Sequence, residues 1–160
     1  MSYTKEQVTK GNRIIYIFMG SPYFPLDNFY PDIKVEYEGL KYNNSEAAFQ
    51  SAKLTNMKDR EKFIKMGAGE SKATGKDPRL TKLRDDWDEV KDQVMYDIVK
   101  DKMNRNPWIK ELLLETGDKI IEEGNSWGDD YWGVNINTGI GRNQLGKTLM
   151  RLRGEFRSAE

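Results

Sequence analysis

The 160-residue sequence contains no cysteine and no histidine. Without these side chains, the chain cannot form a zinc or iron site from the usual nitrogen and sulfur ligands. It also cannot form a Ser-His-Asp or Cys-His catalytic arrangement, and it lacks the one side chain that ordinarily titrates near neutral pH. Acid–base chemistry is therefore left to carboxylates, lysine, tyrosine or water.

An excess of charge of either sign is also absent, because Lys plus Arg and Asp plus Glu both number 26. No global positive field favours nucleic acid, although a local basic groove is still possible. No run approaches the roughly 18 apolar residues of a membrane helix, and the first residues lack the apolar core of a signal peptide. Together with the absence of cysteine, which fits a reducing compartment, these features predict a cytoplasmic protein with no membrane partner.

The residues that are present indicate a folded domain with a polar surface, since 11% are aromatic and 32% are charged. Short apolar runs predict strands, at residues 14–18, 33–42 (as a hairpin) and 120–122. Apolar spacings of three and four predict helices, at 46–57, 59–66, 80–105, 107–115 and after 143. The Gly-rich stretch 66–78 is predicted to be a loop. We expect a mainly helical α+β domain with a small sheet over 13–158, after a loose lead-in over 1–12.

One helix face carries a group of polar side chains that could support chemistry. Glu46, Gln50 and Lys53 are spaced i, i+4 and i+7, so they fall within about 60° of arc on a helix. The adjoining stripe is apolar, which places these polar groups beside the core. Two interpretations are open: a solvated Glu-Gln-Lys ladder, or an active-site face.

Three further places have two interpretations each. Trp87, after Asp85-Asp86, can wall a pocket or simply pack in the core. The aromatic and acidic loop 127–137 can fold over a ligand or pack on the core. At the start of the last helix, free backbone N–H groups and Arg142 can hold a phosphate, or Asn143 can act as an ordinary N-cap.

An ordered set of short segments resembles the NADAR or YbiA-like family. No single segment is specific, but the segments follow the family's order and span nearly the whole chain. They are DNFYP (27–31), EYEGLKY (36–42), NSEAAFQSAK (44–53), LRDDW (83–87), KMNRNP (102–107), LLLETGD (112–118), DDYWG (129–133) and GRNQLGKTLMRLR (141–153).

The resemblance implies a YbiA-like fold and a hydrolase of N-glycosidic bonds to phosphorylated ribose, with no cofactor and no metal. We favour ADP-ribose attached to guanine, in DNA or in a nucleotide, as the substrate. That activity would belong to DNA repair or to a toxin–antitoxin pair. Two alternatives are open: hydrolysis of early riboflavin-pathway intermediates, and a non-catalytic module that binds ADP-ribose.

The resemblance also assigns roles to individual residues. It implies catalytic roles for Glu46, Lys53 and Asp130. We place the remaining matched polar, aromatic and glycine residues in substrate binding: Asn28, Phe29, Gln50, Arg84, Trp87, Trp132, Gly133, Arg142, Asn143 and Gly146. The sequence departs from the family at Asp27, where Ser is usual, and at Ala47, where His is common.

Cleavage of a ribosyl C1′–N bond needs negative charge near C1′ and a proton for the leaving base. We expect Glu46 to be the main acid–base group and Asp130 its partner. Lys53 either stabilises a charge or attacks C1′ of the opened ribose as a Schiff-base nucleophile. Trp87 and Trp132 would stack on the base or the adenine. Arg142 and the start of the last helix would hold the diphosphate.

Overall fold

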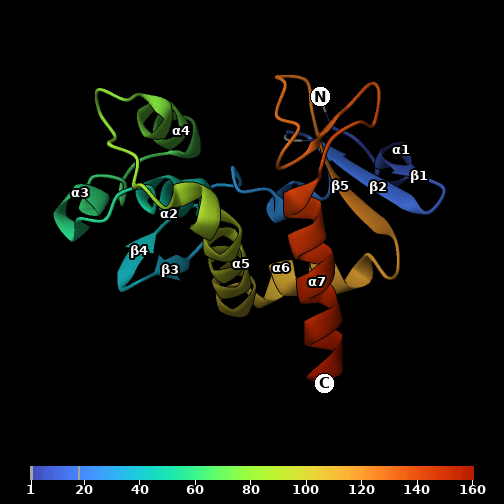
Figure 1. The fold of residues 1–160 in the computed structure, drawn as a ribbon. Helices are drawn as coiled ribbons and strands as arrows, with labels where there is room; N and C mark the ends of the chain where they lie inside the picture. The colour runs from blue at the N-terminus through green and yellow to red at the C-terminus, as the bar shows by residue number, and fades with distance from the viewer. Residues whose placement is uncertain (1, 18) are drawn as a thin grey trace. The chain divides into compact units, whose positions relative to one another are not determined.

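The computed structural model describes residues 2–17 and 19–160. Contacts divide the chain into two compact units, residues 28–107 and residues 1–27 with 108–160. We call the first the helical unit and the second the sheet unit. Helices dominate and the strands form two small sheets (Figure 1), which confirms the predicted α+β class. Phe18, the end of the predicted strand 14–18, lies outside the described residues.

The helical unit is built around one short helix, α2. This helix contacts both strands of a hairpin and the helices α3, α4 and α5 (Figure 1). The elements of the unit are β3 (Val35–Tyr37), β4 (Leu40–Tyr42), α2 (Ser45–Ser51), α3 (Met57–Glu61), α4 (Ala68–Lys76) and α5 (Trp87–Arg105). Because neighbours surround α2, its polar side chains are removed from water together with its apolar ones.

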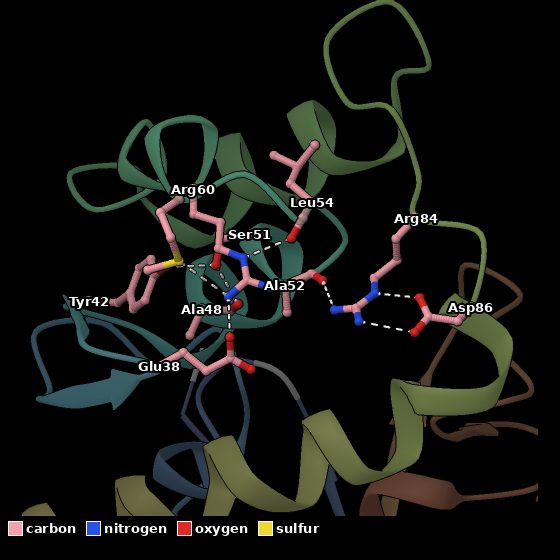
Figure 2. A network of polar contacts seen from close by, with 10 residues as sticks. Glu38, Tyr42, Ala48, Ser51, Ala52, Leu54, Arg60, Arg84 and Asp86 are labelled. Atoms are coloured by element: carbon pink, nitrogen blue, oxygen red, sulfur yellow. Dashed lines mark hydrogen bonds and ion pairs between the residues drawn. The ribbon is translucent and has the colours of Figure 1, made fainter.

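The predicted hairpin is confirmed, with β3 and β4 antiparallel. Glu38 and Gly39 both have positive φ, 46° and 87°, as the tight turn that matches strand twist requires. Arg60 of α3 holds this turn by donating from Nη1 to the Glu38 carboxylate at 2.7 Å. Its Nε donates to the Leu54 carbonyl at 2.8 Å, so one buried guanidinium joins the hairpin to the segment after α2 (Figure 2).

The prediction of a loop over 66–78 is wrong, because residues 68–76 form α4. Ser71 and Gly75 are the buried residues of this helix and lie four positions apart, on one face. The small side chains allow α4 to approach α2 closely, and this packing offsets the roughly 1 kcal/mol that a helical glycine costs. Sequence propensity favours a loop here, whereas packing produces a helix.

Other helix boundaries also differ from the predicted ones. The predicted helix 46–57 ends at Ser51, and α3 begins only at Met57, after the N-cap Asn56. The predicted helix 80–105 begins at Trp87. Pro107 is the first residue of α6 (Pro107–Glu115), as predicted. The apolar periodicity located these helices but did not locate their ends.

The sheet unit contains a four-stranded sheet in the order β1-β2-β5-β6. The strands are β1 (Thr9–Lys10), β2 (Arg13–Ile17), β5 (Ile120–Asn125) and β6 (Val134–Asn135). β1 is antiparallel to β2, and the other pairs are parallel. The last helix, α7 (Gln144–Ser158), contacts β5. The predicted strand 120–122 is confirmed and extends to Asn125, whereas β6 was not predicted. The short helix η1 (Phe24–Leu26) completes the unit.

Part of the expected loose lead-in has regular structure. Thr4 caps α1 (Lys5–Val8), with its side chain accepting from the Gln7 N–H, and the Gln7 side chain bonds back to the Thr4 backbone. This reciprocal capping stabilises even a single helical turn. β1 then pairs with β2. The domain boundary at residue 13 stays a prediction.

Candidate functional site

All seven residues of α2 are buried, including Glu46 at 7% exposure and Gln50 at 5%. The interpretation of this face as a solvated ladder is therefore wrong. Asn44 is the N-cap of α2, and its side chain accepts the Ala47 N–H at 2.7 Å. Since burying a carboxylate is costly unless it is hydrogen-bonded, Glu46 needs partners within the protein.

The structure pairs Glu46 directly with Gln50 on the next turn. Gln50 Nε2 donates to Glu46 Oε1 at 2.7 Å. The other end of that amide, Gln50 Oε1, is buried and has no hydrogen-bond donor among the described residues. The backbone N–H of Glu46 donates to the Asn28 carbonyl at 3.0 Å. The bond from Gln50 orients the Glu46 carboxylate, and the bond to Asn28 holds the first turn of α2.

Lys53 lies just after α2 and is half-buried. Its Nζ contacts the Gly75 carbonyl of α4 at 3.4 Å. Burial lowers the pKa of Lys53, the positive charge of Lys72 lowers it further, and the negative charge of Glu46 opposes both. A lowered pKa increases the fraction of neutral amine, which is the nucleophilic form of lysine.

A pocket of about 330 Å³ opens beside Lys53 in the helical unit. Its lining is Lys53, Gly75, Lys76, Pro78, Thr81, Leu83 and Trp87. Trp87 is 7% exposed, and its ring centroid lies 5.1 Å from that of Phe49, at an interplanar angle of 57°. Trp87 is therefore both a core residue and a pocket wall. An apolar wall facing two lysines suits a ligand with a flat ring and an anionic group.

Asn28 and Phe29, at the start of the helical unit, support α2 and α4. Asn28 is buried, and its Nδ2 contacts Met95 Sδ at 3.3 Å. The Phe29 ring lies 5.5 Å from Lys72 Nζ, a cation–π contact. Ala47, where the family commonly has His, is fully buried. Substrate binding by Asn28 and Phe29 stays a prediction.

Arg84 bonds to the protein through both its backbone and its guanidinium, and Figure 2 shows the guanidinium contacts. Nε and Nη2 donate to the two carboxylate oxygens of Asp86, at 2.6 and 3.1 Å. Nη1 contacts the carbonyl of Ala52 at 3.3 Å, and the Arg84 backbone N–H donates to the Lys53 carbonyl at 2.9 Å. These bonds fasten the end of α2 to the segment that leads into α5. The described contacts of Arg84 are thus structural, and its binding of substrate stays a prediction.

In the sheet unit, the two adjacent aspartates of the loop between β5 and β6 have different surroundings. Asp129 Oδ1 accepts the N–H groups of Tyr131 and Trp132, at 3.2 and 3.0 Å. Asn125 bonds the Asp129 backbone in both directions. Asp130 is exposed, and within the described residues its carboxylate makes no hydrogen bond or ion pair. Asp129 therefore holds the loop in shape, while Asp130 is available to a ligand. Trp132 packs edge-on against Tyr131, with centroids 4.9 Å apart.

The start of α7 does not offer the predicted phosphate-binding N–H groups. The backbone N–H groups of residues 142–145 donate to carbonyls of residues 130–133, at 2.7–3.2 Å. This part of the expectation is wrong because the preceding loop uses these donors. The Arg142 side chain is exposed, with its guanidinium 5.5 Å from the Tyr131 ring centroid. A role for that side chain in binding phosphate stays a prediction.

Asn143 is the residue before α7, but it does not cap the helix with its side chain. Instead, its φ is 55°, its Nδ2 donates to the Ile121 carbonyl at 2.8 Å, and its Oδ1 accepts the Glu123 N–H at 3.1 Å. A Cβ at Gly146 would lie 2.3 Å from the same Ile121 carbonyl. A Cβ at Gly133 would lie 2.4 Å from the carbonyl of Glu123. These three residues fasten α7 and the loop to β5, and their binding of substrate stays a prediction.

Sequence reasoning missed the contribution of α4 to the pocket. Gly75 and Lys76 line the pocket, and Lys72 acts on Lys53, yet the stretch 66–78 was predicted to be a loop. The signal that could have identified the helix is the four-residue spacing of Ser71 and Gly75. In the described part of the chain, no three His, Cys, Asp or Glu side chains gather as a metal site requires. No helix described there is long and apolar enough to span a membrane.

Comparisons with known proteins agree over nearly the whole chain. The model of the NADAR domain family matches residues 17–157. The chain is 35% identical over 149 residues to N-glycosidase Npun_R5314 of Nostoc punctiforme, covering 90% of this chain and 93% of that protein. Over 123 residues it is 32% identical to N-glycosidase YbiA of Escherichia coli, covering 76% and 75%.

A riboflavin biosynthesis protein, VVA0006 of Vibrio vulnificus, is 32% identical over 132 residues, but the match covers only 35% of that larger protein. Among solved structures, the NMR structure of E. coli YbiA matches with a TM-score of 0.79 and 28% identity. The match covers 99% of this chain and 93% of that one.

Proposed function

The chain belongs to the NADAR domain family, and we propose that it is an N-glycosidase that hydrolyses the C1′–N bond of a phosphorylated ribose. The proposed substrate is ADP-ribose attached to guanine. The observation that carries the proposal is a buried carboxylate, Glu46, that Gln50 orients and whose charge acts on Lys53, a residue that lines the pocket together with Trp87. Relatives named as N-glycosidases support the reaction class.

The chemistry available fits this reaction. Departure of a base from C1′ leaves positive charge on the ribose, which a nearby carboxylate stabilises. Glu46 can also deliver the proton that the leaving base requires. A reader of ADP-ribose would need neither a buried carboxylate nor a lysine of lowered pKa on the same surface, so the non-catalytic alternative is disfavoured.

Lys53 has two roles that experiment can distinguish. In the covalent one, which we favour, the ribose ring opens at C1′–O4′ as O4′ takes a proton from Glu46 and C1′ becomes doubly bonded to the base nitrogen. The neutral amine of Lys53 then adds to C1′, and Glu46 relays a proton from that amine to the base as the bond between C1′ and the base breaks. Water then hydrolyses the resulting imine, returning the free amine and releasing the sugar as its aldehyde. In the other, Lys53 stabilises the charge of Glu46 or of a phosphate, and water attacks C1′ directly. Borohydride added during turnover should reduce the imine to a stable adduct on Lys53; active enzyme without an adduct contradicts the covalent role.

Residues of the sheet unit contribute to the proposal only through the family resemblance. Asp130 as the partner carboxylate, Trp132 as a stacking surface and the Arg142 side chain as a phosphate contact are part of what we propose. The exposed carboxylate of Asp130 suits such a role, whereas Asp129 is used within its own loop. Asp130→Asn should lower turnover at least 10-fold, and Asp129→Asn should chiefly loosen the loop; equal activity of Asp130→Asn and wild type excludes Asp130.

The experiment for the function is a substrate panel read by mass spectrometry. It contains a guanine oligonucleotide carrying ADP-ribose, free ADP-ribosylguanosine, and early riboflavin-pathway intermediates. We expect release of free ADP-ribose from the guanine substrates. Binding without release would leave an ADP-ribose reader, and no turnover of any member would contradict the proposal.

A second candidate function has its own support, namely the match to riboflavin biosynthesis protein VVA0006. In that case the same groups would release an amine from ribose 5-phosphate. The panel separates the two functions, because preferential turnover of the riboflavin intermediates would replace the guanine-linked substrate with this one.

A further inference from the structure

Gly75 of α4 packs against Gln50 of α2, beside the candidate catalytic groups. Gly75 is buried near the end of α4. A Cβ at this position would lie 1.9 Å from Gln50 Oε1 and 2.7 Å from Gln50 Cδ. These distances are far inside van der Waals contact, so any residue other than glycine must displace the Gln50 side chain.

Displacement of Gln50 would not be confined to Gln50, because its amide orients Glu46. A carboxylate only accepts hydrogen bonds, so the nitrogen of the Gln50 amide faces Glu46 and the oxygen faces Gly75. The amide therefore fills the space between the Gly75 backbone and the Glu46 carboxylate. Displacing the Gln50 amide therefore removes a hydrogen bond that orients Glu46.

The same glycine also contacts the second candidate catalytic group. The Gly75 carbonyl lies 3.4 Å from Lys53 Nζ, and both residues line the pocket of about 330 Å³. One residue of α4 thus contacts Lys53 through its carbonyl and reaches Glu46 through Gln50.

We propose that Gly75 is a positioning residue that sets the geometry of Glu46 and Lys53 together. This inference rests on the proposed function, since it concerns the same active site. In this role α4 keeps the Glu46 carboxylate and the Lys53 amine in a fixed relative position. This requires that position 75 has no side chain.

The expected kinetic consequence follows from the geometry. Displacing reacting groups by about 1 Å typically costs on the order of 100-fold in rate. The proposal therefore predicts that Gly75→Ala lowers kcat by about 10- to 100-fold, with KM changed by less than about 3-fold. Loss of the Gln50 hydrogen bond also removes a donor that favours the charged carboxylate. The limb of the pH–rate profile that reports Glu46 should therefore move to higher pH.

Gly69→Ala is the matched control. Gly69 lies in the same helix and is exposed, and a Cβ there meets no atom within 4 Å. It should keep wild-type kcat, KM and pH profile. If both variants lose activity equally, the effect belongs to α4 as a helix and the proposal is wrong.

Removal of the Gln50 side chain tests the route of the effect. If Gly75 acts on Glu46 through Gln50, Gly75→Ala combined with Gln50→Ala should have the kcat of Gln50→Ala alone, within about 3-fold. If the kcat losses of the two single variants multiply in the double variant, the proposal is wrong. The double variant also relieves the steric clash, so it provides the test should Gly75→Ala alone fail to fold.

A readout without turnover separates this inference from the proposed function. In Gly75→Ala, the side-chain amide NMR signals of Gln50 should shift, whereas Gly69→Ala should leave them unchanged. If the wild-type protein is inactive on every panel substrate, the proposed function is contradicted. The NMR comparison still tests whether Gly75 determines the position of Gln50. Unchanged Gln50 signals, or an active Gly75→Ala with wild-type kcat, would overturn the inference about Gly75 alone.

Discussion

Helix α2 and the start of helix α7 look alike in the sequence, since each combines a conspicuous polar motif with a helix N-terminus. The structure uses them differently. In α2 and just beyond it, Gln50 Oε1 lacks a donor among the described residues, and Lys53 makes a long, 3.4 Å contact with a carbonyl. At the start of α7, the Asn143 side chain and the backbone N–H groups of residues 142–145 all have partners within the sheet unit.

The comparison distinguishes residues that are available to a substrate from residues that stabilise the fold. Buried polar groups whose hydrogen-bonding capacity is spent on backbone stabilise the fold and have little left for a ligand. Incompletely satisfied groups beside a pocket cost stability, and they are the groups that a substrate can satisfy. This criterion supports our proposal that the chemistry lies at α2 and α4, and it gives the contacts of Asn143 and Gly146 a structural role.

The largest effect is expected at Lys53. Lys53→Met should lower kcat about 100-fold or more, because the amine contributes directly to the reaction in either of its roles. The Lys53→Met variant should nevertheless be more stable than wild type. The pKa of Lys53 is lowered in the folded protein by burial, so the charged form disfavours folding, and stability should rise as pH rises toward the unfolded pKa.

Lys53→Met should remove that penalty and raise the melting temperature at pH 7 by about 1–4 °C. The measurement is thermal unfolding of both proteins between pH 6 and 10, where the difference should shrink as pH rises. A variant that loses both activity and stability would make Lys53 a structural residue.

The next largest effect is expected at Asn143. Asn143→Ala would leave the buried Ile121 carbonyl and Glu123 N–H without partners, which should cost about 2–4 kcal/mol of unfolding free energy. Urea denaturation measures this loss. If Asn143 only builds the fold, KM measured below the melting transition stays at the wild-type value; a raised KM would place Asn143 at the substrate, as the family resemblance implies.

Gly146 provides a steric counterpart within α7. Gly146→Ala places a Cβ 2.3 Å from the Ile121 carbonyl, and this overpacking should destabilise the protein by about 1–3 kcal/mol. Gly154→Ala, in the same helix with no atom within 4 Å of the new Cβ, should instead stabilise it by roughly 0.5–1 kcal/mol. Identical melting temperatures for the two variants would mean that α7 does not require close contact with β5.

The smallest effect concerns the Glu38–Arg60 pair at the hairpin turn. Burial alone would raise the pKa of Glu38, but hydrogen bonds from Arg60 and Tyr37 outweigh it and lower the pKa. The pair therefore adds stability above the unfolded pKa, which is lost as pH falls through the folded value. Glu38→Gln should cost about 0.2–1 kcal/mol at pH 7 and progressively less as pH falls and Glu38 is protonated. A difference in melting temperature that stays constant as pH falls would show that the ion pair does not stabilise the turn.

Much of the fold was predictable, because apolar periodicity reports burial directly. It located α5, α6 and α7, and short apolar runs located the hairpin within residues 33–42. The α4 helix was missed because Gly67, Gly69 and Gly75 have low helix propensity, and only packing against α2 explains why this segment is helical. The expected phosphate site at the start of α7 was wrong in its backbone part because the partners of those N–H groups lie about 12 residues away along the chain.

For the candidate site, helical spacing and the family resemblance together named Glu46, Gln50 and Lys53, although Lys53 lies just beyond the end of α2. The resemblance also named Trp87. Sequence reasoning did not anticipate Lys72 and Gly75, because their proximity to Lys53 depends on how α4 packs. Positions within an element follow from periodicity, whereas contacts between elements require the folded chain.

The central claim, that the buried face of α2 performs the chemistry, is tested most directly by Glu46→Gln. This change keeps the size of the side chain and an oxygen that can accept from Gln50 Nε2, but it removes the charge and the acid–base group. Turnover of the best panel substrate and the affinity for ADP-ribose should be measured on the same preparation. We predict a fall in kcat of about 10²- to 10⁴-fold, with affinity for ADP-ribose within about 3-fold of wild type. Full activity in this variant would remove Glu46 from the reaction, and with it the catalytic role of the α2 face.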